Sequence, residues 1–178
     1  MEQLSTRIVY QNPWTTVRED EVRWPDGSTG RYGVVDRPDC VLVLPRGDGG
    51  WWMVEQFRYP IGRRSLEFPQ GGWPAGRTGS ALELARLELG EETGLTAETF
   101  ERIGYLHTAG SLITQGCDLF VATGLTEGEP DREHTEQDME HRFVPDAELA
   151  GLITDGEIVD SATVAALQLY TLTRPGDV

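Results

Sequence analysis

The feature that most constrains this chain is a short segment with three carboxylates at helical spacing. Glu88, Glu91 and Glu92 stand at positions i, i+3 and i+4, and Gly94 follows them. In an α-helix this spacing puts the three side chains on one side, and glycine is favoured just after a helix ends. Like charges so close together repel one another. We therefore expect a positive partner between them, and a divalent cation is the simplest one.

The sequence around these glutamates predicts a helix from Ser80 to Thr93. Ser80 and Glu83 form a capping box, and the segment has no proline and is rich in Ala, Leu and Glu. Its first turns carry apolar residues on the same side as the glutamates, so the first half should dock on a core while the last turn faces a polar cleft. The alternative is a solvated acidic face, although acids near a helix C-terminus oppose the helix dipole.

This segment resembles the Nudix box, Gly-x5-Glu-x7-Arg-Glu-U-x-Glu-Glu-x-Gly-U, in which U is a bulky aliphatic residue. By this resemblance Gly71 begins the box, which is then about two residues longer than the pattern. Leu87 replaces the arginine that orients the carboxylates in the family, so Arg86 or another cation would have to substitute. The upstream glutamate becomes Arg77 or Gly79. The positions that match at the other end are Glu88, Leu89, Glu91, Glu92, Gly94 and Leu95.

Three further segments resemble the ADP-ribose pyrophosphatase branch of the Nudix hydrolases. Residues 54–60 resemble a strand that ends in a Gln-x-Arg element, residues 67–71 resemble the lead-in to the box, and residues 155–163 resemble the closing element. The resemblance implies the α/β (α+β) class, with a Nudix-type α/β/α sandwich around a mixed β-sheet.

Turn signals divide the chain into two regions. Residues 17–24 and 32–35 alternate in polarity around Asp26-Gly27, which predicts an N-terminal antiparallel hairpin. We place this hairpin in an N-terminal region, residues 1–37, and the Nudix hydrolase domain in residues 38–178. By resemblance, the N-terminal region is a dimerisation element and the protein a homodimer.

The remaining elements are predicted from hydrophobic patterns and glycine-rich turns. Residues 40–44 and 52–57 should form a second strand pair, and residues 127–137 a polar loop. Further strands are expected at 100–107, 117–122 and 139–144, and helices at 146–153 and 161–172.

Composition excludes several classes of protein. A formal net charge of -15 over 178 residues leaves no basic stripe for nucleic acid. No run has the apolar length of a membrane span, and the first residues lack the features of a signal peptide, so we expect a cytoplasmic protein with no membrane partner. Cys40 and Cys117 fall in predicted strands and should be buried free thiols. The three histidines are too scattered for a zinc site.

The acidic cluster predicts a magnesium site, because Mg²⁺ prefers oxygen ligands and the segment offers no soft ones. We expect Glu88 and Glu92 to be the principal ligands, with Glu91 as a further ligand or a water-orienting group. By resemblance, the backbone carbonyl of Gln70 completes the ligand shell. Mn²⁺ is the alternative ion.

The resemblance also implies a catalytic acid or base in the loop after the sixth strand. Glu136 is the first choice, while Asp138 and Glu140 also fit, and a solvated charge is the alternative for each of them.

Three residues are candidates for binding substrate. Arg58 could engage phosphate oxygens with two hydrogen bonds, although a surface ion pair is its alternative. Glu67 belongs to the lead-in to the box. Trp14, like Trp24 and Tyr32, could stack on a base, although packing or a dimer interface is the more common role for such aromatic residues.

Together these features predict magnesium-dependent hydrolysis of the pyrophosphate bond in a nucleoside diphosphate derivative, ADP-ribose or a nucleotide sugar, to give two monophosphates. The loop at Ala109-Gly110-Ser111 and the nearby Gln115 depart from the branch, which leaves the exact substrate open. The alternative is a catalytically weak Nudix domain that binds a nucleotide as a sensor. Leu87 favours this alternative, whereas the three retained glutamates oppose it.

Overall fold

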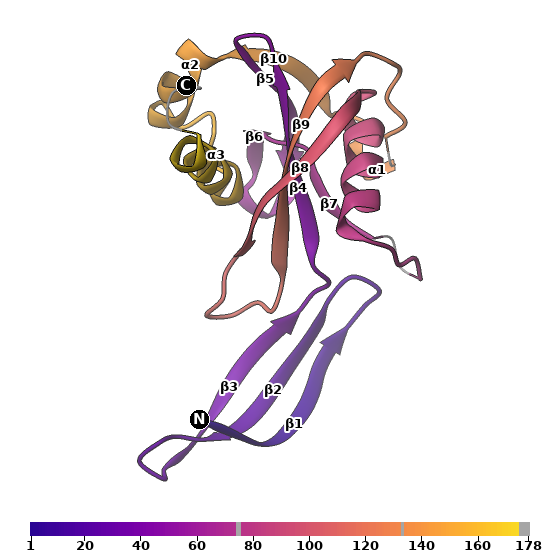
Figure 1. The fold of residues 1–178 in the computed structure, drawn as a ribbon. Helices are drawn as coiled ribbons and strands as arrows, with labels where there is room; N and C mark the ends of the chain where they lie inside the picture. The colour runs from indigo at the N-terminus through magenta and orange to yellow at the C-terminus, as the bar shows by residue number, and fades with distance from the viewer. Residues whose placement is uncertain (74–75, 133, 175–178) are drawn as a thin grey trace.

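The computed structural model describes residues 1–73, 76–132 and 134–174. Figure 1 shows a sheet with helices on both sides and a separate N-terminal sheet that projects from one end. The strands are β1 Glu2–Gln11, β2 Thr16–Arg23, β3 Thr29–Asp36, β4 Cys40–Gly47, β5 Gly50–Arg58, β6 Arg63–Glu67, β7 Gln70–Gly72, β8 Thr96–His107, β9 Gly116–Thr126 and β10 Glu140–Pro145. The helices are α1 Ala81–Thr93, α2 Asp146–Thr154 and α3 Ser161–Thr173, with short 3₁₀ turns η1 Tyr59–Ile61 and η2 His134–Glu136.

The main sheet is mixed, as the sequence predicts. Its strand order is β10-β5-β4-β9-β8, with β6 paired to β5 and β7 paired to β4. The β4–β9 pair is parallel and the others are antiparallel. Strands β4 and β5 form the predicted second pair around the glycine-rich turn, but their paired residues are confined to Arg46–Trp51 and Gly47–Gly50, so residues 40–44 do not pair with residues 52–57. Farther from the turn, β4 pairs with β7 and β5 pairs with β6.

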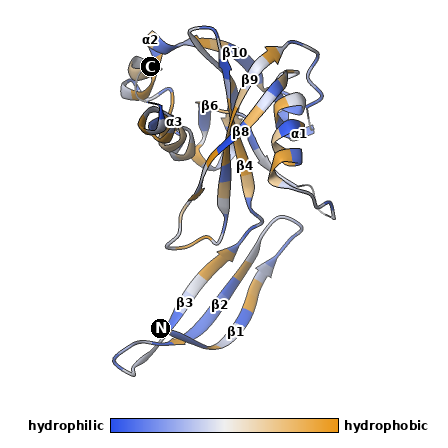
Figure 2. Ribbon diagram, viewed as in Figure 1, coloured by the Kyte–Doolittle hydropathy of each residue, from blue (hydrophilic) through white to orange (hydrophobic). Residues whose placement is uncertain are grey.

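Strand β4 separates two hydrophobic cores. Leu42 and Leu44 face the core formed with α2 and α3, whereas Val41 and Val43 face the core beneath α1. This alternation follows from the two-residue period of a strand, and a strand buried on both faces must be apolar throughout. Figure 2 shows the hydrophobic colouring of β4 inside the sandwich.

The N-terminal region forms a three-stranded antiparallel sheet, β1-β2-β3. Strands β2 and β3 are the predicted hairpin, while β1 was missed because every residue in it is exposed and gives no burial pattern. The sheet is attached to the loop before β9. There Val35 donates to the carbonyl of Leu112 at 2.9 Å and accepts from the N–H of Thr114 at 3.0 Å.

The predicted helices are confirmed to within a few residues. In α1, Ser80 and Glu83 form the capping box, and Gly94 ends the helix in the left-handed conformation at φ 75°. Within the described residues, no helix has the length and apolar character needed to cross a membrane.

Candidate active site

The last turns of α1 hold two buried carboxylates against the start of the box. Glu88 and Glu92 are 7% and 1% exposed, respectively. Gly71, in β7, lies directly over Glu88, because a Cβ atom placed there would stand 2.3 Å from Glu88 Oε2. Only a residue without a side chain lets β7 approach this closely. The glycine that begins the box therefore makes room for the carboxylate.

Electrostatics favour a cation beside Glu92. Burial raises the pKa of Glu92 well above its usual value, and the charges of Glu88 and Glu136 raise it further. Arg58 and a backbone hydrogen bond from Gln70 act in the opposite direction. One carboxylate oxygen of Glu92, Oε2, is buried without a hydrogen-bond partner among the described residues. A buried carboxylate with an unsatisfied oxygen fits a hard divalent cation.

The same carboxylates do not converge into a finished ligand shell. Among residues 1–73, 76–132 and 134–174, no group of three His, Cys, Asp or Glu side chains is arranged to hold a metal ion. Glu88 and Glu92 therefore fit as the protein's part of a site in which water or substrate oxygens supply other ligands, which is the usual arrangement for Mg²⁺.

A hydrogen-bonded chain runs beside the carboxylates. Arg58 Nε lies 3.0 Å from both carboxylate oxygens of Glu67. Gln70 Nε2 donates to Glu67 Oε2 at 2.9 Å and to Asp160 Oδ2 at 3.3 Å. The same oxygen of Asp160 accepts from the backbone N–H of Thr163 at 2.8 Å, which caps the N-terminus of α3. The chain thus fixes Arg58 and Gln70 relative to the α3 end of the sandwich.

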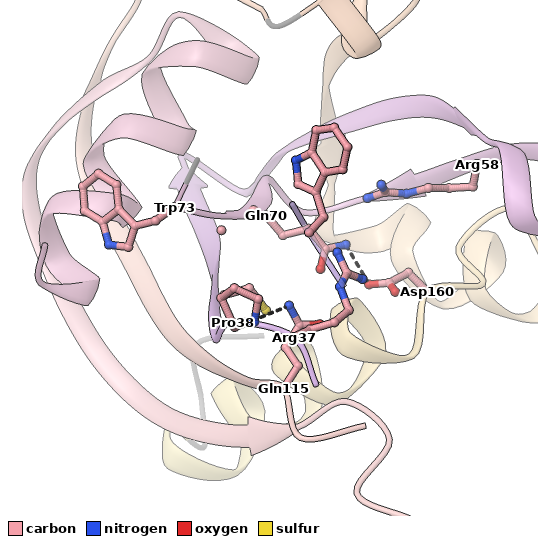
Figure 3. A pocket seen from close by; sticks show the side chains of 11 residues that line it. Arg37, Pro38, Arg58, Gln70, Trp73, Gln115 and Asp160 are labelled. Carbon is pink, nitrogen blue, oxygen red and sulfur yellow. Dashed lines mark hydrogen bonds between the residues drawn. The ribbon is translucent and has the colours of Figure 1, made fainter. Parts of the chain in front are cut away.

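Three residues of this hydrogen-bonded chain, Arg58, Gln70 and Asp160, line a cavity of about 360 Å³. Figure 3 shows Gln70 between Trp73 and Arg58, with its hydrogen bond to Asp160. The cavity combines cationic, aromatic and amide groups with bare glycine backbone, a combination that can take an anion joined to a flat ring. The residues that line it are Trp14, Arg37, Pro38, Cys40, Arg58, Gln70, Gly71, Gly72, Trp73, Gln115 and Asp160.

Most of the residues predicted for substrate and metal are brought together. Trp14, Arg58 and Gln70 line the cavity, and Glu67 holds Arg58. Glu88 lies directly against Gly71 on the cavity wall. The side-chain amide of Gln70 donates to Glu67, and its backbone N–H donates to Glu92.

The loop acids divide into two groups. Glu136, in η2, lies near enough to raise the pKa of Glu92. Asp138 instead accepts a hydrogen bond from Arg64 at 3.0 Å on the exposed side of β6.

Glu91 is half-buried, and its backbone carbonyl accepts from the N–H of Asp131 at 3.0 Å. This bond holds the loop after β9 against the end of α1.

The arginine missing from the box is not replaced by Arg86. The Arg86 guanidinium lies over the ring of Phe100 at 5.0 Å, and Leu87 packs against the core beneath α1. Two cations from elsewhere serve the end of the helix instead. Arg58 acts on the Glu92 carboxylate, and Arg132 Nε donates to the Glu92 backbone carbonyl at 3.0 Å. A cation at this position also offsets the helix dipole.

Arg37, Trp73 and Asp160 line the cavity but are not among the predicted site residues, and Gln115 was named only as a departure from the branch. Asp160 had a detectable signal, because it precedes Ser161 as a helix N-cap within the closing segment. The other three reach the cavity from loops whose position depends on the fold.

Comparison with known proteins identifies related hydrolases. Residues 1–35 match the family model of the nucleoside diphosphate sugar hydrolase N-terminal domain. An ADP-ribose pyrophosphatase of Mycobacterium tuberculosis is 34% identical over 93% of this chain and 81% of its own length. An ADP-ribose pyrophosphatase of Bacillus subtilis is 31% identical over 86% of this chain and 83% of its own.

The fold matches as well. A crystal structure of an ADP compounds hydrolase superposes with a TM-score of 0.85, covering 99% of this chain and 96% of that one at 23% identity. At that identity the match shows the fold, while the two sequence relatives show the family. The chain therefore belongs to the Nudix hydrolases, in their ADP-ribose pyrophosphatase-like branch, and is a hydrolase.

Proposed function

We propose that this protein hydrolyses the pyrophosphate bond of a nucleoside diphosphate derivative, ADP-ribose or a nucleotide sugar, and releases two monophosphates. The observation that carries the proposal is the buried pair Glu88 and Glu92 behind a cavity that also presents Arg58. The names of the two sequence relatives support ADP-ribose as the first substrate to test, and the family of the N-terminal match supports nucleotide sugars as the second.

Glu88 and Glu92 would hold Mg²⁺, with Glu91 and the backbone carbonyl of Gln70 as further ligands and Mn²⁺ as the alternative ion. When bound, the ion neutralises charge on the phosphates and makes water more acidic. The unsatisfied carboxylate oxygen of Glu92 supports this ligand set, because Mg²⁺ prefers oxygen ligands.

Arg58 and Trp14 would bind the two chemically different parts of the substrate. Glu67 holds the Arg58 guanidinium in one plane, so its remaining N–H groups stay directed for phosphate oxygens. Trp14 is 65% exposed at the cavity and can cover a base. Anchoring both parts positions the pyrophosphate at the carboxylates, which is the main requirement for phosphoryl transfer.

Glu136 is the proposed general base, with Asp138 as the second candidate. Its support is electrostatic proximity, because the charge of Glu136 acts on Glu92 across the cleft. A carboxylate so near the metal ligands can accept a proton from an attacking water. Asp138 would first have to leave its ion pair with Arg64.

Product analysis tests the function directly. The purified protein is incubated with ADP-ribose and a panel of nucleotide sugars, with Mg²⁺ or with a chelator, and monophosphates are separated by ion-exchange chromatography. We expect two monophosphates in the presence of Mg²⁺, and none with Glu92→Gln. Tight substrate binding without products would instead support a binding module, and failure to bind or cleave any member of the panel would refute the proposal.

We further propose a homodimer that assembles through the N-terminal region, residues 1–37, beside a Nudix domain of residues 38–178. The exposed strand β1 supports this, because its outer edge pairs with no strand among the described residues. We also propose a cytoplasmic location, which the unlinked state of Cys40 and Cys117 favours.

A further inference from the structure

The two cysteines of the chain are direct neighbours in the sheet. Cys40, the first residue of β4, is the parallel-strand partner of Cys117, the second residue of β9. Directly paired residues on parallel strands point to the same side of the sheet, about 4.8 Å apart at the backbone. That spacing lies within the range of roughly 4.4–6.8 Å that a disulfide spans between Cα atoms. The structure holds both residues as thiols.

The surroundings of the two thiols differ. Cys40 is half-buried and lines the 360 Å³ cavity, so a small solute that enters the cavity can reach it. Cys117 is 1% exposed and lies behind it. The hydrogen bond between the two thiols lowers the pKa of Cys40 and raises the pKa of Cys117. A reachable thiol with a lowered pKa beside a second thiol is the usual arrangement of a peroxide-sensitive pair.

We propose that Cys40 and Cys117 are a redox-sensitive pair, which peroxide converts into a reversible disulfide in the cavity wall. Nothing in the hydrolysis requires either thiol, so this is a modification site additional to the proposed activity.

The reaction takes place in two balanced steps. The Cys40 sulfur attacks hydrogen peroxide, an S–O bond forms as the O–O bond breaks, and water leaves, which gives a sulfenic acid. The Cys117 sulfur then attacks the Cys40 sulfur, an S–S bond forms as the S–O bond breaks, and a second water leaves with the Cys117 proton. Once Cys40 carries no negative charge, that proton is no longer held by the neighbouring thiolate.

The position in the sheet makes the bond easy to reduce. Side chains of paired residues on parallel strands run side by side, so the two Cβ atoms lie close to the strand spacing, farther apart than the ~3.8 Å typical of a disulfide. The strands must therefore shift slightly, which is possible here because both cysteines lie at strand beginnings. Strained disulfides are the labile and regulatory ones.

Thiol counting and peptide mapping test the pair. The reduced full-length protein is treated with hydrogen peroxide, or with diamide as an oxidant that transfers no oxygen, then unfolded and titrated with Ellman's reagent. We expect the loss of both thiols and their recovery with dithiothreitol. Trypsin cleavage without reduction should yield peptide 32–46 joined to peptide 103–132, because these peptides carry the two cysteines.

Two variants distinguish the role of Cys40 from that of Cys117 in the oxidation. In Cys117→Ala, peroxide should oxidise Cys40 to higher oxygen acids, because no second thiol can close the bond. In Cys40→Ser, the buried Cys117 should react at least about tenfold more slowly than Cys40 does in the wild type. The proposal is overturned if the wild type accumulates oxygen acids at Cys40 without the linked peptide. It is equally overturned if both thiols survive peroxide that oxidises Cys117→Ala, or if the only disulfide joins two chains. None of these measurements depends on catalysis, so the thiol pair and the hydrolase activity can fail independently.

Discussion

At the scale of single residues, the site depends on how closely a backbone can approach a carboxylate. Gly71 contacts Glu88 so tightly that any side chain would displace it, whereas a Cβ atom at Gly72 would meet only the Asp39 carbonyl, at 3.5 Å. Two adjacent glycines of one strand therefore have different roles, although the sequence presents them as a pair. The contact is non-local and depends on the packing of β7 against α1.

This difference gives a matched pair of variants. Gly71→Ala should lower kcat by roughly 10–100-fold, the usual effect of displacing a group that supports a metal site. It should also cost about 1–3 kcal/mol of stability through overpacking. Gly72→Ala should change both quantities little. Steady-state kinetics and urea unfolding measure them, and equal effects from the two substitutions would contradict the argument.

The raised pKa of Glu92 predicts how stability depends on pH. Without metal, the folded protein holds the Glu92 proton above the usual value of 4.5, so this stabilising contribution is complete below that value and is lost as pH rises through the raised pKa. In chelator, the unfolding free energy of wild type relative to Glu92→Gln should therefore fall as the pH rises above the usual value of 4.5.

Mg²⁺ should reverse this trend, because it binds the charged carboxylate and stabilises the folded state in wild type but not in Glu92→Gln. Glu98→Gln is the control, since Glu98 is an exposed acid on β8. Urea unfolding over a series of pH values from 4.5 upwards, with and without Mg²⁺, gives the comparison. A flat difference between wild type and Glu92→Gln across that pH range would refute it.

At the scale of elements, the sequence predicts what is locally encoded. Helix α1 is anticipated from Ser80 to Thr93 because its capping box, composition and terminal glycine all lie within the segment. Strand β6 was missed because it is short and begins with two arginines, which give no apolar pattern, although its partner β5 is adjacent in the chain. Strand β7 was missed because it is three residues long and its partner β4 is distant in sequence. Distance along the sequence also explains which residues of the site could be predicted. The glutamates of α1 are local, whereas Arg37, Trp73 and Gln115 join them only through the fold.

Two helix N-caps provide a test at this scale. Asp160 caps α3 and also accepts a hydrogen bond from Gln70 in the cavity, whereas Ser80 caps α1 through Glu83. Asp160→Ala and Ser80→Ala should each cost about 1 kcal/mol of stability. Only Asp160→Ala should also raise KM for the substrate, since it releases Gln70. Unfolding and kinetic measurements on both variants separate capping from positioning, and an equal rise in KM for both would show that Asp160 acts through stability alone.

At the scale of the whole molecule, the N-terminal sheet contributes to the cavity while it stands apart from the sandwich (Figure 1). The turn between β1 and β2 is fixed by Asn12, whose Oδ1 accepts from the backbone N–H of Trp14 at 2.9 Å and of Thr15 at 2.8 Å. This turn places Trp14 at the cavity. The turn between the first two strands of the projecting sheet therefore helps to set the shape of the site.

Strand β1 carries exposed apolar side chains. Ile8 and Tyr10 are 58% and 57% exposed on a strand whose outer edge has no partner among the described residues. Such an edge pairs readily with another chain, and lysine on it prevents pairing. Light scattering should give twice the chain mass of 19.8 kDa for the wild type and the chain mass itself for the double variant Ile8→Lys, Tyr10→Lys.

The monomeric variant should also bind substrate more weakly, because the free sheet holds the Trp14 turn less firmly against the cavity. Leu172→Lys is the matched control, since Leu172 is 69% exposed near the end of α3, away from the N-terminal sheet. It should leave both the mass and KM unchanged. A wild type that is monomeric at micromolar concentration would rule out assembly through β1. A dimer that survives the double substitution would place the interface elsewhere, on a surface that the N-terminal sheet does not provide.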